Sequence, residues 1–428
     1  MSLISGLTCV SCGKTVGNDC TTCPDCGSDN GILDVQYDLD RAAETLTRRS
    51  LTQRTRSHWR YRELLPLDDE FCPTDGVVGW TPLIEAPRLA KALGVARVRL
   101  KDDGRNPSGS FKDRASSVGV AHARQLGFTQ IACASTGNAA SSLAYCAAAA
   151  GLQANIFVSE IIPAGKLAQL LAYGARVFKI RGTYADAYEL CTKTCEHFGW
   201  YNRNCAINPY LVEGKKTGGL EIAEQCADDP PDWVVCSVGD GCSIAGVHKG
   251  LMQMKSVGII AWQTHMLGVQ AAGVAPIAHV WDRFLTGQDD LRHGLPPSSQ
   301  YHDTYADSIN VPAPRNWRKA LSAVKQSDGT FVTVADEQIR QAVRDTGRLT
   351  GIFAEPAAAA AVAGIAEARW QGRIDSQASV VAVITGNGLK DIDGAMQAVG
   401  KPHEIPAELD HVMRIVETQD KANNSGMD

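Results

Sequence analysis

The chain has 428 residues, of which 44% are apolar and 21% are charged, and its net charge is −5. These values are typical of a globular protein, and the length predicts two or three lobes rather than one core. The mildly acidic balance gives no reason to expect nucleic acid or an anionic membrane as a partner. No apolar run approaches the roughly 18–20 residues that span a bilayer, and the first residues lack the apolar core of a secretory signal.

Fourteen cysteines are spread unevenly along the sequence. Five lie within the first 26 residues, and the other nine lie between Cys72 and Cys242. Disulfide frameworks are usual in short secreted chains, so we expect most of the nine to be reduced, buried and weakly polar. This usage predicts a cytoplasmic protein.

The first 30 residues are rich in cysteine and glycine and poor in large apolar side chains. They contain two Cys-x2-Cys pairs, "CVSC" and "CPDC", each followed by glycine. Four thiolates at this spacing suit a structural, tetrahedral zinc ion in a small ribbon. The predicted ligands are Cys9, Cys12, Cys23 and Cys26. Cys20 forms a third such pair with Cys23, so the ligand set stays open, and a ribbon without metal is the alternative.

After the ribbon, residues 36–78 have the composition of a helical arm, and the main body begins near residue 79. From there short apolar runs alternate with helical patterns. Continuous apolar strands between helices predict parallel sheets that are covered on both faces. Examples are the predicted strands 129–135, 232–239 and 378–386 and the alanine-rich helices 138–151 and 356–370. Residues 414–428 are polar, and we expect them to be frayed.

Three glycine-containing loops follow predicted strands, where ligands bind in open α/β sheets. They are "ASTGNAAS" (134–141), "SVGDGCSIAG" (237–246) and "ITGNGLKD" (384–391). The second would let successive N–H groups converge on an anion at a helix N-terminus. Each loop by itself is more often a tight turn than a ligand site.

A lysine, Lys112, stands at the end of the turn-rich stretch "GRNPSGSFKDR" (104–114). Alone it would be read as a solvated surface charge, and Asn138 alone as a helix cap. Together the chain offers a lysine nucleophile, a phosphate nest, an amide and a hydroxyl at strand ends. A cofactor with an aldehyde, a phosphate, a phenolic oxygen and a ring nitrogen would use all four. The combination predicts pyridoxal 5′-phosphate, PLP.

Six motifs then carry a family resemblance, in one order over residues 79–393: "KDDGRNPSGSFKDR", "ACASTGNAASSLA", "NPYLVEGKKT", "SVGDG", "GIFAEPAAAAA" and "TGNGLKD". They resemble threonine synthase and its relatives among the fold-type II PLP enzymes, and the cysteine-rich start resembles the ribbon of some members. The resemblance implies an α/β, tryptophan synthase β-like fold with two parallel-sheet αβα subdomains. The expected units are a ribbon (1–35), an arm (36–78), a catalytic domain (79–410) with a smaller subdomain (111–212) and a larger one (79–110 and 213–410), and a tail (411–428).

The resemblance also implies roles for single residues. Lys112 would form the Schiff base and later move protons on the substrate, with Phe111 close to the cofactor. Asn138 would face the ring hydroxyl, and Thr385 the ring nitrogen. The cofactor phosphate would lie on Gly239, Asp240, Gly241, Cys242 and Ser243. The carboxylate of a small amino-acid substrate would lie on Ser135, Thr136, Gly137 and Asn138.

The implied reaction is the conversion of O-phosphohomoserine to threonine and phosphate. The resemblance, and nothing else in the sequence, also implies a homodimer. Where relatives bind the substrate phosphate with an Asn-Ser pair and an arginine, this chain has Cys205, Ala206 and Leu211. Asp240 replaces an asparagine of the phosphate loop, and Ala139 a threonine. Leucine cannot replace an arginine on phosphate, and an inward carboxylate would repel it.

Two alternatives therefore remain. One is a divergent enzyme for another substrate: a threonine or serine dehydratase, a cysteate-synthase-like enzyme or a biosynthetic tailoring enzyme, working by β-elimination or by β- or γ-replacement. Against this alternative, Lys215 or Lys216 could supply the charge for a substrate phosphate instead, and Arg203 is nearby in the sequence. The other is a non-enzymatic binding module, against which Lys112, Asn138 and Thr385 argue together.

Overall fold

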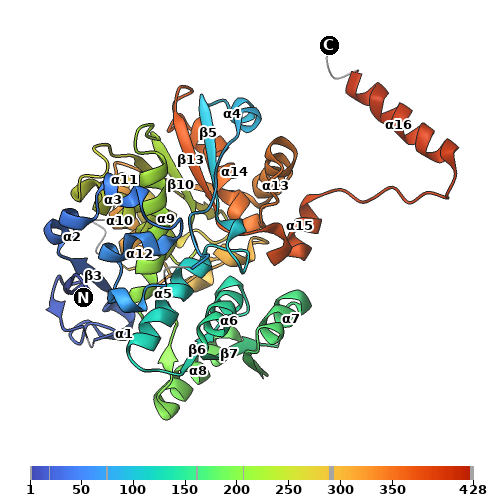
Figure 1. Ribbon diagram of the computed structural model, residues 1–428. Helices are drawn as coiled ribbons and strands as arrows, with labels where there is room; N and C mark the ends of the chain where they lie inside the picture. The colour runs from blue at the N-terminus through green and yellow to red at the C-terminus, as the bar shows by residue number, and fades with distance from the viewer. Residues whose placement is uncertain are drawn as a thin grey trace.

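The computed structural model describes residues 2–18, 20–73, 76–160, 162–205, 207–288 and 294–424. The protein has three sheets and a set of helices that pack between and around them (Figure 1). No helix in the described ranges is long and apolar enough to cross a membrane.

The N-terminal unit is a small antiparallel sheet in the order β2-β1-β3. Its strands are β1 (Ile4–Cys9), β2 (Thr15–Val16) and β3 (Leu33–Tyr37), and the short helix α1 (Gly27–Asn30) precedes β3. Only a few apolar side chains, such as Leu7, Leu33 and Val35, are buried here, which is too little to hold such a unit by apolar packing alone. Asp34 ties it to the body through Lys249 and Lys319, at 3.0 and 3.1 Å.

A six-stranded sheet in the order β12-β11-β10-β13-β5-β4 forms the larger part of the body. Its strands are β4 (Leu83–Glu85), β5 (Arg97–Asp102), β10 (Trp233–Ser237), β11 (His265–Ala271), β12 (Thr330–Val334) and β13 (Ser379–Ile384). All neighbouring pairs are parallel except β4 with β5, so the predicted all-parallel sheet gains one antiparallel edge.

Helices cover both faces of this sheet, as its continuous apolar strands require. One face carries α4 (Pro87–Leu93), α13 (Asp336–Thr350) and the alanine-rich α14 (Pro356–Trp370). The other carries α9 (Tyr210–Gln225), α10 (Cys242–Ser256), α11 (Pro276–Leu285) and α12 (Trp317–Gln326). The short α15 (Ile392–Ala398) follows β13.

A four-stranded parallel sheet in the order β8-β7-β6-β9 lies in the lower part of Figure 1. Its strands are β6 (Gln130–Ala134), β7 (Gln153–Ser159), β8 (Arg176–Ile180) and β9 (Tyr201–Asn202). Helices α6 (Asn138–Ala150) and α7 (Ala164–Ala172) pack on one face and α8 (Tyr184–Phe198) on the other. Helix α5 (Lys112–Gln125) packs against both α6 and α9, and so joins the two larger sheets.

The segment after the ribbon is helical, with α2 (Leu39–Thr45), α3 (Arg48–Thr52) and two 3-10 helices, η1 (His58–Leu64) and η2 (Asp69–Phe71). The expectation of a frayed C-terminus was wrong for most of its length, because residues Leu409–Asn424 form helix α16. Figure 1 shows α16 apart from the body, at the far end of an extended segment that leads out from it. Fraying was expected because the segment is polar, but residues such as Glu, Gln, Lys and Arg also have high helix propensity.

Candidate active site

Lys112 lies where the two larger sheets meet. It begins α5, directly after the turn that follows β5. The backbone N–H of Phe111 donates to the carbonyl of Thr385 at 2.8 Å, and Ser110 forms a bridge with Gly386. Because β5 and β13 are parallel neighbours, their carboxyl ends bring these two loops side by side.

The two residues after Lys112 hold the start of α5 in place. Asp113 accepts hydrogen bonds from the backbone N–H and the hydroxyl of Ser108. Arg114 is fully buried and pairs with Asp103 and Glu221, each at 2.6 Å. A buried ion pair of this kind specifies geometry, because the loss of one partner leaves an uncompensated charge. The "KDR" sequence thus fixes the lysine through its neighbours.

Lys112 itself is in a site that favours its neutral form. Burial lowers the pKa of its ammonium, and the positive charge of Lys215 lowers it further. Cys242 and Cys205 act in the opposite direction, while Arg203 adds to the lowering. A neutral amine is the nucleophilic form, so this environment suits attack on an aldehyde.

Asn138, the first residue of α6, spans the junction between the two sheets. Its side-chain amide donates to both carboxylate oxygens of Glu355, at 3.1 and 2.9 Å. Its carbonyl oxygen is buried and has no hydrogen-bond partner among the described residues. Burial raises the pKa of Glu355, which stands at the N-terminus of α14. A partnerless buried amide oxygen is rare in proteins and points toward a ligand.

The loop between β10 and α10 requires glycine at one position and leaves little room for a side chain at another. Gly241 has φ +93°, and a Cβ there would lie 2.8 Å from the carbonyl oxygen of Asn316. A Cβ on Gly239 would lie 3.1 Å from the Cα of Ile309. The N–H groups at the start of α10, at Cys242 and Ser243, follow directly, as in an anion-binding nest.

Asp240 does not point toward this nest. Its carboxylate accepts hydrogen bonds from the backbone N–H of Arg315 at 2.8 Å and the side-chain amide of Asn316 at 2.6 Å. The repulsion expected from an inward carboxylate is therefore reduced, since the charge is hydrogen-bonded on the side of the α12 N-terminus.

Ser135, Thr136 and Gly137 form the short turn between β6 and α6, all partly accessible. The backbone N–H of Gly137 donates to the Ser135 hydroxyl at 3.1 Å, so the turn is ordered by its own residues. Thr385, at the end of β13, is also partly accessible. These residues lie at strand ends of the two sheets, as the sequence predicts.

The structure describes Leu211, the residue at the position of the family's arginine, and its neighbour in the same motif, Lys216. Leu211 is fully buried and packs on α5, where its Cδ2 would lie 2.7 Å from a Cβ on Gly119. Ala206 lies outside the described residues. Lys216 pairs with Glu213 and lies over the ring of Tyr37, 3.8 Å from its centre, so it belongs to the ribbon contact.

Lys215 and Arg203, in contrast, reach the neighbourhood of Lys112. The Lys215 ammonium donates to the sulfurs of Cys205, at 3.2 Å, and Cys242. The Arg203 guanidinium lies 4.0 Å from the same Cys205 sulfur. Sequence reasoning gave Glu355 no role and left these two cations open, because only the fold shows which side chains converge.

These residues fit PLP. An amine in a site that favours neutrality, a buried amide with a free carbonyl oxygen, and a glycine nest at a helix N-terminus are present in one junction. They match the aldehyde, ring hydroxyl and phosphate of the cofactor in chemical kind.

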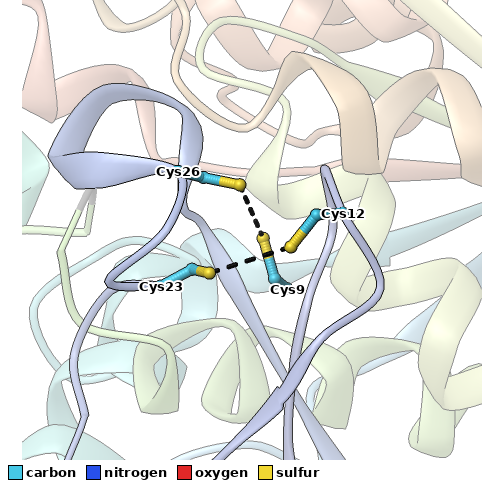
Figure 2. A group of neighbouring side chains, drawn as sticks. All are labelled: Cys9, Cys12, Cys23 and Cys26. Atoms are coloured by element: carbon cyan, nitrogen blue, oxygen red, sulfur yellow. Dashed lines mark hydrogen bonds between the residues drawn. The ribbon is translucent and has the colours of Figure 1, made fainter.

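The four predicted zinc ligands also come together, from two loops of the ribbon (Figure 2). The sulfurs of Cys9 and Cys26 lie 3.8 Å apart, as do those of Cys12 and Cys23, and all four lie within 4.8 Å of one another. Sulfurs around a tetrahedral zinc at about 2.3 Å are separated by roughly 3.8 Å, so the group has the size of a zinc site. Cys20 is not part of it.

Comparison with known proteins agrees with this geometry. The family model described as "Pyridoxal-phosphate dependent enzyme" matches residues 74–386. Threonine synthase of Methanocaldococcus jannaschii is 36% identical over 411 residues, covering 95% of this chain and 98% of the relative. That of Methanosarcina acetivorans is 37% identical over 415 residues, covering 96% and 98%. That of Synechocystis sp. is 38% identical, covering 85% and 91%.

The chain therefore belongs to the pyridoxal-phosphate dependent enzymes, in their threonine-synthase-like group. Solved structures show the same fold: processed threonine deaminase isoform 2 of Solanum lycopersicum matches with a TM-score of 0.62 at 23% identity, covering 74% of this chain and 87% of that one. Diaminopropionate ammonia lyase of Escherichia coli gives 0.62 at 17% identity, covering 85% and 93%. The predicted fold class, PLP as cofactor and the enzyme class are confirmed.

Proposed function

We propose that the protein converts O-phosphohomoserine and water to threonine and inorganic phosphate. The observation that carries the proposal is the similarity to threonine synthases over 95–96% of the chain. The small-molecule substrate is then an amino acid whose phosphate leaves from Cγ and whose Cβ gains the hydroxyl. The equation balances as one phosphate ester and one water consumed, and one alcohol and one phosphate formed.

In this proposal Lys112 does the proton transfers. When bound, PLP supplies the electron sink that makes the Cα–H bond acidic. Lys112, the residue whose amine would hold the cofactor, would also take the Cα proton and return protons to carbon. Burial lowers the pKa of its ammonium, which favours the amine form that a base needs. Phe111, packed on Gly218 of α9, fixes the backbone from which Lys112 projects.

The other predicted site residues hold the reactants. Asn138 would face the cofactor ring hydroxyl and Thr385 the ring nitrogen. A threonine hydroxyl does not keep that nitrogen protonated as a carboxylate would, which suits elimination and replacement. The N–H groups of Gly239, Asp240, Gly241, Cys242 and Ser243 would hold the phosphate of the cofactor. Ser135, Thr136, Gly137 and the start of α6 would hold the substrate carboxylate.

A second candidate is a β-elimination or β/γ-replacement enzyme for another amino acid. The observation that favours it is Leu211, which occupies the position of the family's arginine and is buried against α5. This candidate keeps every role given above except the recognition of the leaving group.

One screen separates the two. The protein loaded with PLP is mixed with O-phosphohomoserine, O-phosphoserine, threonine or serine, and the absorption of the cofactor, phosphate and amino-acid products are followed. The proposal expects threonine and phosphate in equal amounts from O-phosphohomoserine. Turnover of another substrate without any threonine from O-phosphohomoserine would select the second candidate.

We further propose that four thiolates of the ribbon bind one structural zinc, that the protein is a cytoplasmic homodimer, and that the ribbon, arm, catalytic domain and tail are its functional units. The domain proposal is supported by the separate ribbon sheet and the separate cores of the two larger sheets. The resemblance to threonine synthases supports the homodimer, and the cysteine usage supports the compartment.

A further inference from the structure

Two buried cations near Lys112, Lys215 and Arg203, have no carboxylate partner among the described residues, unlike the buried Lys101 and Lys216. Lys101, Lys215 and Lys216 are the fully buried lysines of the described ranges. Lys101 pairs with Glu221 at 2.7 Å, and Lys216 pairs with Glu213. The ammonium of Lys215 instead donates to two sulfurs, those of Cys205 and Cys242. Sulfur is a weak acceptor, so a buried ammonium held this way keeps most of its attraction for an anion.

Arg203 shows the same deficit. Its side chain is 2% exposed, and it donates to the hydroxyl of Ser116 at 3.0 Å. Its Nε is buried without a partner among the described residues, and its Nη1 lies 4.0 Å from the Cys205 sulfur. A guanidinium is the side chain best suited to an oxyanion, and no carboxylate of the described ranges is paired with this one.

Both cations converge on one atom, the sulfur of Cys205. The pKa of the Cys205 thiol is well below its usual value, because it is hydrogen-bonded to Cys242 and lies beside Lys215 and Arg203. One sulfur thus lies beside two buried positive charges. Asp240 also acts on Lys215, but its carboxylate is hydrogen-bonded to Arg315 and Asn316. The cluster retains net positive charge.

Lys215, Arg203 and Cys205 form a cluster, and the position of this cluster relative to Lys112 indicates which anion it binds. Lys215, Cys205 and Arg203 all act electrostatically on Lys112, the residue that meets the substrate. Lys215 lies one helical turn after Leu211 on α9, so the two share a face. The family has an arginine where this chain has Leu211. Lys215 supplies a positive charge one turn further along the same helix.

We propose that Lys215 and Arg203, with Cys205 between them, bind the anionic leaving group of the amino-acid substrate, a phosphate or another oxyanion. This inference rests on the proposed function for the identity of the substrate. The cluster takes the place of the arginine and the Asn-Ser pair that the sequence lacks. It also makes Lys215 and Arg203 the residues that determine specificity.

The cofactor phosphate is the other source of the same chemistry, because Cys242 begins α10 beside the glycine nest. The experiment therefore has separate arms for cofactor and substrate. Holoenzymes of the wild type, Lys215→Gln, Arg203→Gln and Arg203→Lys are compared with Lys193→Gln, a change at an exposed pair with Glu189 on α8. Binding of O-phosphohomoserine and homoserine to the holoenzymes, and of PLP to the matching apoproteins, is measured by absorption of the cofactor.

We expect Lys215→Gln and Arg203→Gln each to weaken O-phosphohomoserine binding by about tenfold or more. Homoserine, which lacks only the phosphate, and PLP keep their affinities, Arg203→Lys is intermediate, and Lys193→Gln resembles the wild type. An equal loss for both amino acids, no loss, or a loss confined to PLP would overturn the inference.

A second readout does not require turnover. Alkylation of Cys205 by iodoacetamide, located by mass spectrometry, is slowed by inorganic phosphate in the wild type and not in Lys215→Gln. Phosphate-insensitive alkylation in the wild type would contradict the site. If the wild type forms no threonine but binds O-phosphohomoserine more tightly than homoserine through Lys215, the proposed function fails and the anion site stands.

Discussion

The side-chain amide of Asn138 donates to both carboxylate oxygens of Glu355, across the junction of the two larger sheets. One residue begins α6 on the four-stranded sheet, and the other begins α14 on the six-stranded sheet. The backbone N–H of Glu355 also donates to the carbonyl of Gly386, so the loop after β13 joins the same contact. The pair orients the amide that we assign to the cofactor ring.

Removal of this amide should weaken cofactor binding more than a change in its partner. We expect Asn138→Ala to raise the Kd for PLP by about tenfold, because a hydrogen bond to the ring is lost. Glu355→Gln keeps one acceptor oxygen, so its effect is smaller. Titration of the apoprotein with PLP, followed by visible absorption, measures both. A larger effect of Glu355→Gln would show that Asn138 does not act on the ring.

The role of the glycine nest can be tested by comparing alanine substitutions at the two ends of α10. Gly241 and Gly258 flank α10, and both have positive φ, +93° and +77°. Gly241→Ala should cost about 1–3 kcal/mol and weaken PLP binding, since its Cβ would strike the Asn316 carbonyl. A Cβ on Gly258 meets nothing within 4 Å, so Gly258→Ala carries the backbone strain alone. Equal PLP affinity in the two variants would argue against the nest.

The ribbon should depend on its metal. We expect about one zinc per chain in freshly prepared protein and loss of that metal in Cys23→Ser, because three thiolates bind zinc more weakly than four. Cys20→Ser should keep the metal, since Cys20 is outside the group of four. Elemental analysis of the two variants gives the answer. A metal-free wild type, or loss of zinc in Cys20→Ser alone, would refute the assignment.

Acid should destabilise the protein through buried neutral histidines. Burial lowers the pKa of His122 to about 4, and this ring lies 2.9 Å from the hydroxyl of Tyr201 and stacks on Tyr210. Because the unfolded pKa is near 6.5, the unfolded chain binds the extra proton first. The stabilisation is complete above about pH 6.5 and is lost as the pH falls toward 4, on the order of 3 kcal/mol for this group. Urea unfolding at several pH values should show a smaller loss in His122→Gln, and identical slopes would count against this cause.

Local patterns predicted most of the helices and strands, and the proposed cofactor residues were chosen from local motifs at the strand ends. Apolar runs and glycine-ended helices mark β6, α6 and β13 within one or two residues of their ends. The family motif led directly to Lys112. The antiparallel β4 was missed because a three-residue edge strand leaves no periodic signal.

Local sequence patterns did not predict the direction in which side chains point. Asp240 raised the expectation of repulsion, yet its carboxylate turns toward α12, which is 75 residues away in the sequence. Likewise, nothing local distinguishes Lys215 from Lys216, although one reaches the thiol cluster and the other binds Glu213. Such outcomes depend on contacts between distant segments, which only the folded chain defines.

The most direct measurement of the central claim is product formation from O-phosphohomoserine by the wild type and by Lys112→Ala, both incubated with PLP. The account predicts equal amounts of threonine and phosphate from the wild type, with visible absorption of lysine-bound PLP. It predicts neither product nor that absorption from Lys112→Ala. A colourless wild type that ignores PLP, or undiminished threonine formation by Lys112→Ala, would contradict it.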